Sequence, residues 1–173
     1  MPSLNVTGTD IPTGTQCPSI FLEPGQQVTF PPNCSYIPTV QVKSGAQLTF
    51  PCSSTPYHMG SLSTEPNGAL VFAMASGCTN AKVYIHGTLT FKGTMSSGGN
   101  PAFTSTINVL FVVTSSNMVD IQSNFNGVLM APNAYIHAVP GKHHYGAFYG
   151  STVYLEQDTE FEHRPFNAPL PLQ

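Results

Sequence analysis

The stretch that decides the fold reads GQQVTFP over residues 25–31 and returns as GAQLTFP over residues 45–51, an offset of 20 residues. A weaker copy, GTLTF, occupies residues 87–91, and residues 127–136 align with residues 146–155 at an offset of 19. A short repeat of this kind cannot bury its own apolar face and must stack on its neighbours. The repeats therefore predict a right-handed parallel β-helix (β-solenoid) of about 19–20 residues per coil. The expected columns of stacked side chains are Val28 over Leu48, Phe30 over Phe50, and Tyr135 over Tyr154.

Short apolar runs lie between the repeats and are bounded by Gly, Pro, Asn and Ser. β-branched and aromatic residues dominate runs such as 70–74, 83–85 and 107–113, which is typical of strands. No window of the chain has helical periodicity. An antiparallel β-sandwich also contains many short strands and is the alternative fold. The expected division is an N-terminal extension over residues 1–18, a β-solenoid over residues 19–164, and an extended Pro-rich tail over residues 165–173.

The composition excludes several classes of protein. Charged residues make up only 8% of the 173 residues, and the net charge is −3. Five Lys and Arg residues are too few for the basic surface that binds a nucleic acid. No apolar run approaches the roughly 20 residues of a membrane span, and 40% hydrophobic residues with a low net charge argue against disorder. We therefore expect a neutral, β-rich domain with no nucleic-acid partner and no membrane span.

The chain has four cysteines, which are Cys17, Cys34, Cys52 and Cys78. An even number of cysteines in a chain of low charge indicates two disulfides and an oxidising compartment. No Cys-x-x-Cys pair occurs, so a zinc site is the less favoured interpretation. The three possible pairings stay open. We expect a secreted or cell-surface protein, and the triplets at Asn5 and Asn33 match the N-glycosylation pattern.

A second signature lies in the later repeats. Residues 127–136 read GVLMAPNAYI, and residues 146–155 read GAFYGSTVYL. This pair resembles the Gly-x-φ-x-Ala-Pro-Asn-Ala-x-φ and Gly-Ala-φ-x-Gly segments of bacterial secreted and cell-surface β-helix modules, of the choice-of-anchor and pilus-assembly-associated type. The resemblance covers about residues 68–163, and the His-Tyr-Asp-like end of the family is replaced by FEHR at residues 161–164. It implies a right-handed parallel β-helix on a cell surface or appendage, with a structural or adhesive role and no catalytic residues.

Three histidines in the last third of the chain are candidate metal ligands, namely His137, His143 and His144. Imidazole nitrogens are common ligands of transition metals. Adjacent histidines on a strand point to opposite faces, so His143 and His144 can share an ion only in a turn. The Pro-Gly pair at residues 140–141 favours such a turn. The alternative is an exposed polar loop, and we expect no bound metal or other cofactor.

Half of the eight carboxylates fall at alternate positions between residues 156 and 162. On one strand this spacing would place Glu156, Asp158, Glu160 and Glu162 on the same face. We interpret the row as a solvated edge that blocks further strand pairing, and a cation site or an acid–base pair is the alternative. No G-x-S-x-G or phosphate-binding motif occurs. We therefore expect that the protein is not an enzyme.

The sequence thus predicts a non-enzymatic structural or adhesive protein that forms, or is displayed on, an extracellular fibre or surface. The ends of a strand stack expose unpaired backbone, which favours self-association into oligomers or filaments. The tail adds Phe166, Leu170 and Leu172 as candidate assembly residues, because its prolines keep it extended. The alternative is a carbohydrate-binding or carbohydrate-active β-helix, lyase- or hydrolase-like, in which tyrosines stack on sugars. The expected partner is accordingly a second copy of the chain or a surface glycan.

Overall fold

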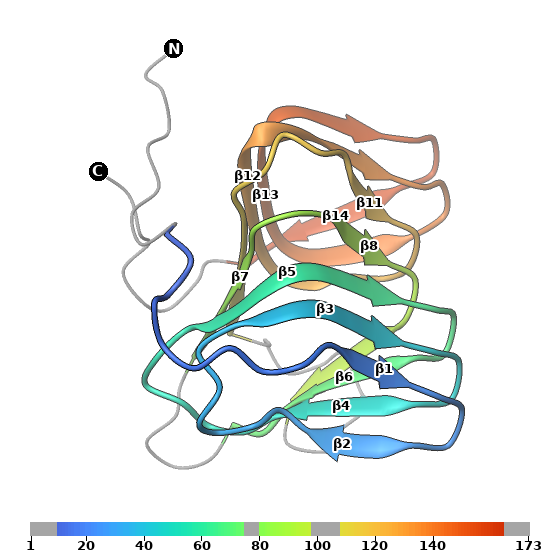
Figure 1. The fold of residues 1–173 in the computed structure, drawn as a ribbon. Coiled ribbons are helices and arrows are strands. Elements are labelled where there is room, and N and C mark those ends of the chain that lie inside the picture. Colours follow the sequence, from blue (N-terminus) through green and yellow to red (C-terminus); the bar gives the residue numbers. More distant parts are fainter. Residues whose placement is uncertain (1–9, 75–79, 98–107, 165–173) are drawn as a thin grey trace.

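The computed structural model describes residues 10–74, 80–97 and 108–164. These residues form fourteen β-strands and no helix, so the all-β prediction is confirmed (Figure 1). The strands are β1 (Ile20–Leu22), β2 (Gln27–Thr29), β3 (Ile37–Val42), β4 (Gln47–Phe50), β5 (Tyr57–Thr64), β6 (Ala69–Phe72), β7 (Ala81–Ile85), β8 (Leu89–Phe91), β9 (Thr94–Ser97), β10 (Val109–Val113), β11 (Val119–Ile121), β12 (Asn126–Ala138), β13 (His143–Leu155) and β14 (Glu160–His163). The described part of the chain contains no helix long and apolar enough to cross a membrane. The predicted sites at Asn5, Cys78, Phe166, Leu170 and Leu172 lie outside the described residues.

All strand pairings in the described residues are parallel. The larger sheet runs β1-β3-β5-β7-β10-β12-β11-β8, with β13 on β12 and β14 on β13, and a second sheet runs β2-β4-β6-β9. β8 also pairs with β5, so β5, β7, β10, β12, β11 and β8 form a closed six-stranded parallel barrel. The predicted right-handed parallel β-helix, which the family resemblance also implied, is therefore wrong. The alternative of an antiparallel β-sandwich is wrong as well.

Two long strands close the barrel. Residues 57–59 of β5 pair with β7, whereas residues 62–64 of the same strand pair with β8. β12 pairs in the same way with β10 through residues 128–130 and with β11 through residues 136–138. A repeat in the sequence predicts which residues lie opposite each other, but not that one strand bends and pairs with two different partners. The fold prediction failed for this reason.

The first repeat does form a stack of strands. β2, β4 and β6 pair in register, with Val28 opposite Leu48 and Leu48 opposite Leu70. The predicted pairing of Val28 with Leu48 is thus confirmed, although Val28 is exposed and Leu48 is buried. The weaker copy at residues 87–91 belongs to the larger sheet, because Leu89 pairs with Leu62 of β5. Its similarity to the first two copies therefore does not place it in the same sheet as β2 and β4.

Phenylalanine rings fill the core. The ring of Phe30 stacks on Phe50 with 5.5 Å between centroids, as predicted, and Phe50 stacks on Phe72 at 4.7 Å. A second contact is edge-to-face, between Phe91 and Phe125 at 5.5 Å. Each of these rings is at most 1% exposed. Because apolar burial is the main favourable term in folding, these rings are expected to dominate the stability of the chain.

Three rows of side chains cross seven strands of the larger sheet, namely β1, β3, β5, β8, β11, β12 and β13. Two rows point inward and the row between them points outward, as the alternation along a strand requires. Inner row A is Ile20, Val40, Leu62, Leu89, Val119, Ile136 and Val153. Inner row B is Leu22, Val42, Thr64, Phe91, Ile121, Ala138 and Leu155. The outer row is Phe21, Gln41, Ser63, Thr90, Asp120, His137 and Tyr154.

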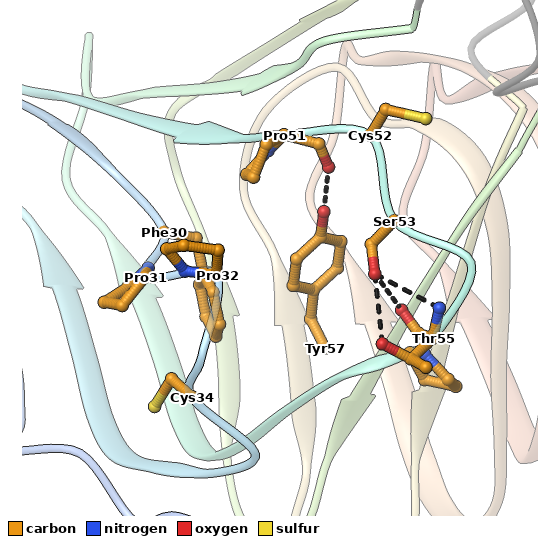
Figure 2. Close-up of a pocket in the computed structure, with 10 residues that line it drawn as sticks. Phe30, Pro31, Pro32, Cys34, Pro51, Cys52, Ser53, Thr55 and Tyr57 are labelled. Atoms are coloured by element: carbon orange, nitrogen blue, oxygen red, sulfur yellow. Dashed lines mark hydrogen bonds between the residues drawn. The ribbon is translucent and has the colours of Figure 1, made fainter.

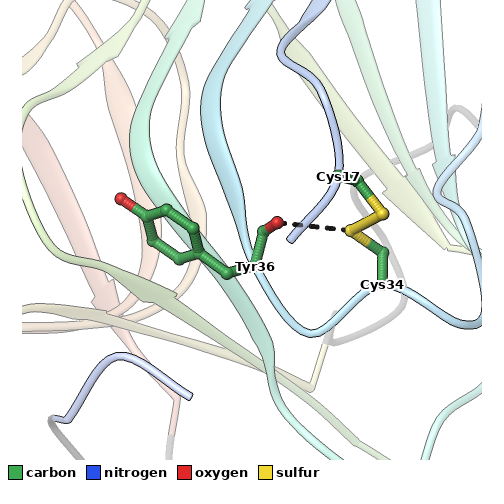
Figure 3. The surroundings of a disulfide bond; sticks show 3 residues. All are labelled: Cys17, Cys34 and Tyr36. Atoms are coloured by element: carbon green, nitrogen blue, oxygen red, sulfur yellow. Dashed lines mark hydrogen bonds between the residues drawn. A yellow bond between two sulfur atoms is a disulfide. The ribbon is translucent and has the colours of Figure 1, made fainter. Parts of the chain in front are cut away.

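A disulfide bond joins Cys17 to Cys34 (Figure 3). It ties the segment before β1 to the loop before β3, where the backbone N–H of Cys17 also donates to the carbonyl of Tyr36 at 2.9 Å. The predicted use of disulfides is confirmed for this pair, and Cys52 is not a free thiol. A disulfide indicates an oxidising setting. Asn33, next to this bond, is exposed.

Replacing both Cys17 and Cys34 with Ser is expected to lower the free energy of unfolding by about 3 kcal/mol. The physical reason is that the bond spans 17 residues and restricts the unfolded chain. Chemical denaturation of the variant and the parent protein, both without reductant, measures the difference. Equal free energies of unfolding would show that this bond does not restrict the unfolded chain.

Candidate functional site

Strands β11, β12 and β13 bring two carboxylates to one histidine on the outer face of the sheet. Nδ1 of His137 lies 3.3 Å from Oδ1 of Asp120, and its Nε2 lies 2.6 Å from Oε1 of Glu156. The first contact follows from the register, which sets Asp120 directly opposite His137. The second arises because Glu156 comes directly after β13, where its N–H donates to the carbonyl of Ala138 at 3.0 Å. Each nitrogen of the His137 imidazole thus contacts one carboxylate, and these contacts connect β11, β12 and the residue that follows β13.

Two exposed tyrosines lie beside this histidine. The ring centroids of Tyr135 and Tyr154 lie 6.5 and 5.9 Å from that of His137, with interplanar angles of 18° and 22°. We call these three residues the Tyr135 patch. The rings of Tyr135 and Tyr154 stack as predicted, with 6.3 Å between centroids, but their predicted place in the core is wrong. A register irregularity after Ala131 sets Tyr135 opposite Thr152. Both tyrosines therefore lie on the surface, 37% and 51% exposed.

The three candidate metal ligands are not brought together. His137 lies on the outer face, whereas Nδ1 of His143 contacts Oε2 of Glu160 at 2.9 Å and His144 is buried in the interior. His143 and His144 lie within β13 and not in a turn, so they point to opposite faces. Within residues 10–74, 80–97 and 108–164, no group of three or more His, Cys, Asp or Glu side chains is placed to hold a metal ion.

His144 is fully buried and packs against the ring of Phe148, with 5.2 Å between centroids. Its Nδ1 accepts a hydrogen bond of 3.3 Å from the N–H of Phe125. Burial lowers the pKa of His144 to about 4, and the nearby charges of His143 and Lys142 act in the same direction. The imidazole is therefore neutral at pH 7, because burial of the ring makes its charged form unfavourable.

Acidification from pH 7 to pH 4 is expected to destabilise the protein through His144. An unfolded histidine takes up a proton below about pH 6.5, whereas folded His144 does so only near pH 4. The unfolded state therefore binds more protons across this window, and the free energy of unfolding falls by about 3 kcal/mol as the pH decreases. Stability is fully present above pH 6.5.

A matched variant isolates this effect. His144→Asn keeps an acceptor for the N–H of Phe125 but does not titrate. Urea unfolding of both proteins at several pH values between 4 and 7 should give the variant the smaller loss of stability. Parallel pH profiles would mean that His144 does not cause the acid sensitivity, since every other titrating group is common to both proteins.

A second histidine pair lies at β5 and directly after β7. Nδ1 of His58 is 3.1 Å from Nε2 of His86, and the ring of His58 stacks on Tyr84 with 5.0 Å between centroids. Burial, and then the charge of His86, lower the pKa of His58 to about 4. One neutral ring can donate to the other, so this contact is a hydrogen bond that holds two strands together.

The four alternating carboxylates do not share one face, which corrects that prediction. β13 ends at Leu155 and β14 begins at Glu160, and Asp158 has a φ of 58° in the turn between them. A residue in this left-handed conformation breaks the alternation of a strand. The other three carboxylates have separate partners: Glu156 contacts His137, Glu160 contacts His143, and Glu162 forms an ion pair with Arg164.

A small pocket of about 130 Å³ lies among the loops after β2 and β4 (Figure 2). Its lining is Phe30, Pro31, Pro32, Cys34, Pro51, Cys52, Ser53, Thr55, Pro56 and Tyr57. The hydroxyl of Tyr57 donates to the carbonyl of Pro51, and burial raises the pKa of this tyrosine. The lining carries no acid, base or cation, and the volume is below the roughly 300 Å³ of a typical small-molecule site. We interpret the pocket as a packing space between proline-rich loops.

The last described strands leave one end of the larger sheet without a further strand. Within residues 108–164, β14 pairs only with residues 143–146 of β13. Over residues 147–155, the pairing of β13 in the described part of the chain is with β12 alone. Val153 and Leu155 end the two inner rows and are 38% and 41% exposed, whereas Ile136 and Ala138 before them are fully buried.

A shallow apolar groove of about 300 Å³ follows this edge. Its lining is Ala147, Phe148, Tyr149, Val153, Leu155, Phe161 and His163. The rings of Phe148 and Phe161 meet edge-to-face at 4.9 Å and form its floor. Mainly apolar walls beside an unpaired strand edge suit another polypeptide better than a polar substrate. We call this surface the β13 end.

Sequence reasoning missed the contact of Asp120 and Glu156 with His137. A signal was present, because the separations of 17 and 19 residues are close to the repeat length of the second half of the chain. Titratable residues one repeat apart lie opposite or next to each other on neighbouring strands. The β13 end has no such signal, since Val153 and Leu155 resemble every other member of their rows.

No protein-family model, curated protein or solved structure matches the chain. The β13 end and the Tyr135 patch are the two surfaces of the described residues whose geometry bears on function.

Proposed function

We propose that the protein is a non-enzymatic structural or adhesive domain of an extracellular fibre or cell surface, which acts by associating with copies of itself. The observation that carries the proposal is the exposure of Val153 and Leu155, at the end of rows whose members on β3, β5, β8, β11 and β12 are buried. The oxidising setting indicated by the Cys17–Cys34 bond supports a location outside the cytosol.

Apolar burial and strand pairing at the β13 end favour association, and little charge repulsion opposes it. Covering apolar side chains removes them from water and gains about 25 cal/mol per Å² of apolar surface. A second strand would also pair with the backbone groups of residues 147–155 that point away from β12, which have no strand partner in the described part of the chain. The net charge of −3 over 173 residues produces little repulsion between copies.

Sedimentation velocity over a wide range of concentration tests this proposal on the full chain. The sedimentation coefficient should rise with concentration. The double variant Val153→Lys/Leu155→Lys should remain monomeric, because two charges cannot be buried in an apolar contact. Met118→Lys, at a residue that is 53% exposed between β10 and β11, is the matched control and should behave like the parent. A monomer at every concentration would overturn self-association as the function.

A second candidate function is carbohydrate binding at the Tyr135 patch. Sugars present C–H groups that stack on aromatic faces, and the exposed rings of Tyr135 and Tyr154 offer such faces. Asp120 and Glu156 lie beside the rings and can accept hydrogen bonds from sugar hydroxyls.

A glycan array with the parent protein, with and without calcium, tests this second candidate. Tyr135→Ala should lose binding, and Tyr149→Ala, which removes a tyrosine of similar exposure outside the patch, should keep it. No bound glycan, or equal binding by both variants, would exclude the patch as a sugar site.

A further inference from the structure

We infer that copies of the chain associate head to tail, so that β1 of one copy pairs in parallel with the free edge of β13 of the next. This inference rests on the proposed self-association and names its two surfaces. In the described residues, the pairing of β1 is with β3 alone, and β13 is uncovered beyond residue 146. The two edges lie at opposite ends of the molecule, β1 among the blue strands and β13 among the orange ones (Figure 1). One copy can therefore offer both edges at once.

The direction of the strands favours a head-to-tail contact. Every pairing in the described residues is parallel, and β1 runs in the same direction as the strands that follow it in the larger sheet. A copy that is displaced along the stack presents β1 parallel to β13. A two-fold contact between two β13 edges would instead pair them antiparallel. The head-to-tail contact thus repeats a geometry that the fold already uses.

The side chains of β1 also match those at the end of β13. β1 consists of Ile20, Phe21 and Leu22, and β13 ends in Val153, Tyr154 and Leu155, both in the order inner, outer, inner. Setting Ile20 opposite Val153 and Leu22 opposite Leu155 continues the two inner rows into the next copy. The same register sets Phe21, which is 56% exposed, beside Tyr154, which is 51% exposed. Aromatic neighbours across a strand pair stabilise a sheet.

The same register makes a specific electrostatic prediction. Glu23 follows Leu22 and Glu156 follows Leu155, so the two carboxylates would become neighbours across the contact. Each already has a partner of its own copy, Lys43 at 2.7 Å and His137 at 2.6 Å. Their residual repulsion should weaken the contact, and Glu23→Gln should therefore strengthen association.

Single charge variants at the two ends test the inference. Phe21→Lys and Tyr154→Lys should each weaken self-association by up to about fivefold, because each removes one ring of the aromatic pair across the contact. Phe21→Lys keeps an intact β13 end, and Tyr154→Lys keeps an intact β1. At a concentration where neither variant associates with itself, an equal mixture of the two should therefore form dimers of one copy of each and nothing larger. Met118→Lys is the control for an added surface charge.

The possible outcomes separate this inference from the proposed function. If the parent associates and Phe21→Lys associates equally well, the contact does not use β1 and the inference is wrong, while self-association stands. If neither variant weakens association, another surface makes the contact and the inference is again wrong. If the parent is monomeric and associates only after residues 165–173 are deleted, the tail of the same chain covers the open end, and both the inference and the proposed function fail.

Discussion

Replacing Phe50 with Ala is expected to lower the free energy of unfolding by about 3–5 kcal/mol. The ring lies between Phe30 and Phe72, at 5.5 and 4.7 Å, and meets Tyr57 edge-to-face at 5.1 Å. It is 1% exposed, so its removal leaves a cavity that paired strands on both sides cannot easily fill. Urea denaturation followed by circular dichroism measures the loss.

Phe21→Ala is the matched control, because it makes the same chemical change at a ring that is 56% exposed. At a protein concentration where both chains are monomeric, its effect should stay within about 0.5 kcal/mol. If the two substitutions had equal effects, the stacked phenylalanine rings would not be the main source of stability.

Replacing Gly146 with Ala is expected to destabilise the fold by about 3 kcal/mol or more, as the sum of backbone strain and steric overlap. Gly146 has a φ of 134°, which L-residues rarely adopt, and an added Cβ would overlap the carbonyl oxygen of Gly127. The overlap cannot relax easily, because the two glycines lie opposite each other in the β12–β13 pairing.

Gly25→Ala separates the two causes. Gly25 also has a positive φ, of 82°, but a Cβ added there meets no atom within 4 Å. Only the backbone term applies, so the loss should be about 1–2 kcal/mol. Thermal unfolding of both variants gives the comparison. Similar losses would indicate that the approach of β12 to β13 at Gly146 is not sterically limiting.

Much of the local structure of this chain could be predicted from its sequence. The offset of 20 residues between Gln27–Thr29 and Gln47–Phe50 is the offset of their strand pairing. It also predicted the stacking of Phe30 on Phe50. Such predictions succeed because identical residues at a fixed spacing give the lowest energy when they lie opposite each other in neighbouring strands.

The arrangement of the strands could not be predicted in the same way. The closure of the barrel depends on β5 and β12, whose 8 and 13 residues each pair with two partners. No residue type marks such a bend. The irregularity between Ala131 and Tyr135 then moves every later residue of β12 relative to β13, so Tyr154 lies opposite His137 and not Tyr135. A shift in register changes the partner of each side chain that follows it.

The candidate sites show the same limit. The Tyr135 patch depends on that shift in register, and the β13 end depends on which strand is last. Val153 and Leu155 belong to rows whose members on β3, β5, β8, β11 and β12 are buried, so nothing in their residue types marks them as exposed. Both side chains are exposed because, among the described residues, no further strand pairs with residues 147–155.

The most direct test of head-to-tail association is to determine which residues of two copies lie side by side. Phe21→Cys and Tyr154→Cys are purified separately, mixed in equal amounts, oxidised, and examined by mass spectrometry of the cross-linked peptides. Paired residues of neighbouring strands lie about 5 Å apart, which is within reach of a disulfide. Head-to-tail association predicts cross-links between positions 21 and 154 in the mixture and none in either variant alone. Cross-links between two copies of position 154, or no cross-link in the mixture, would contradict it.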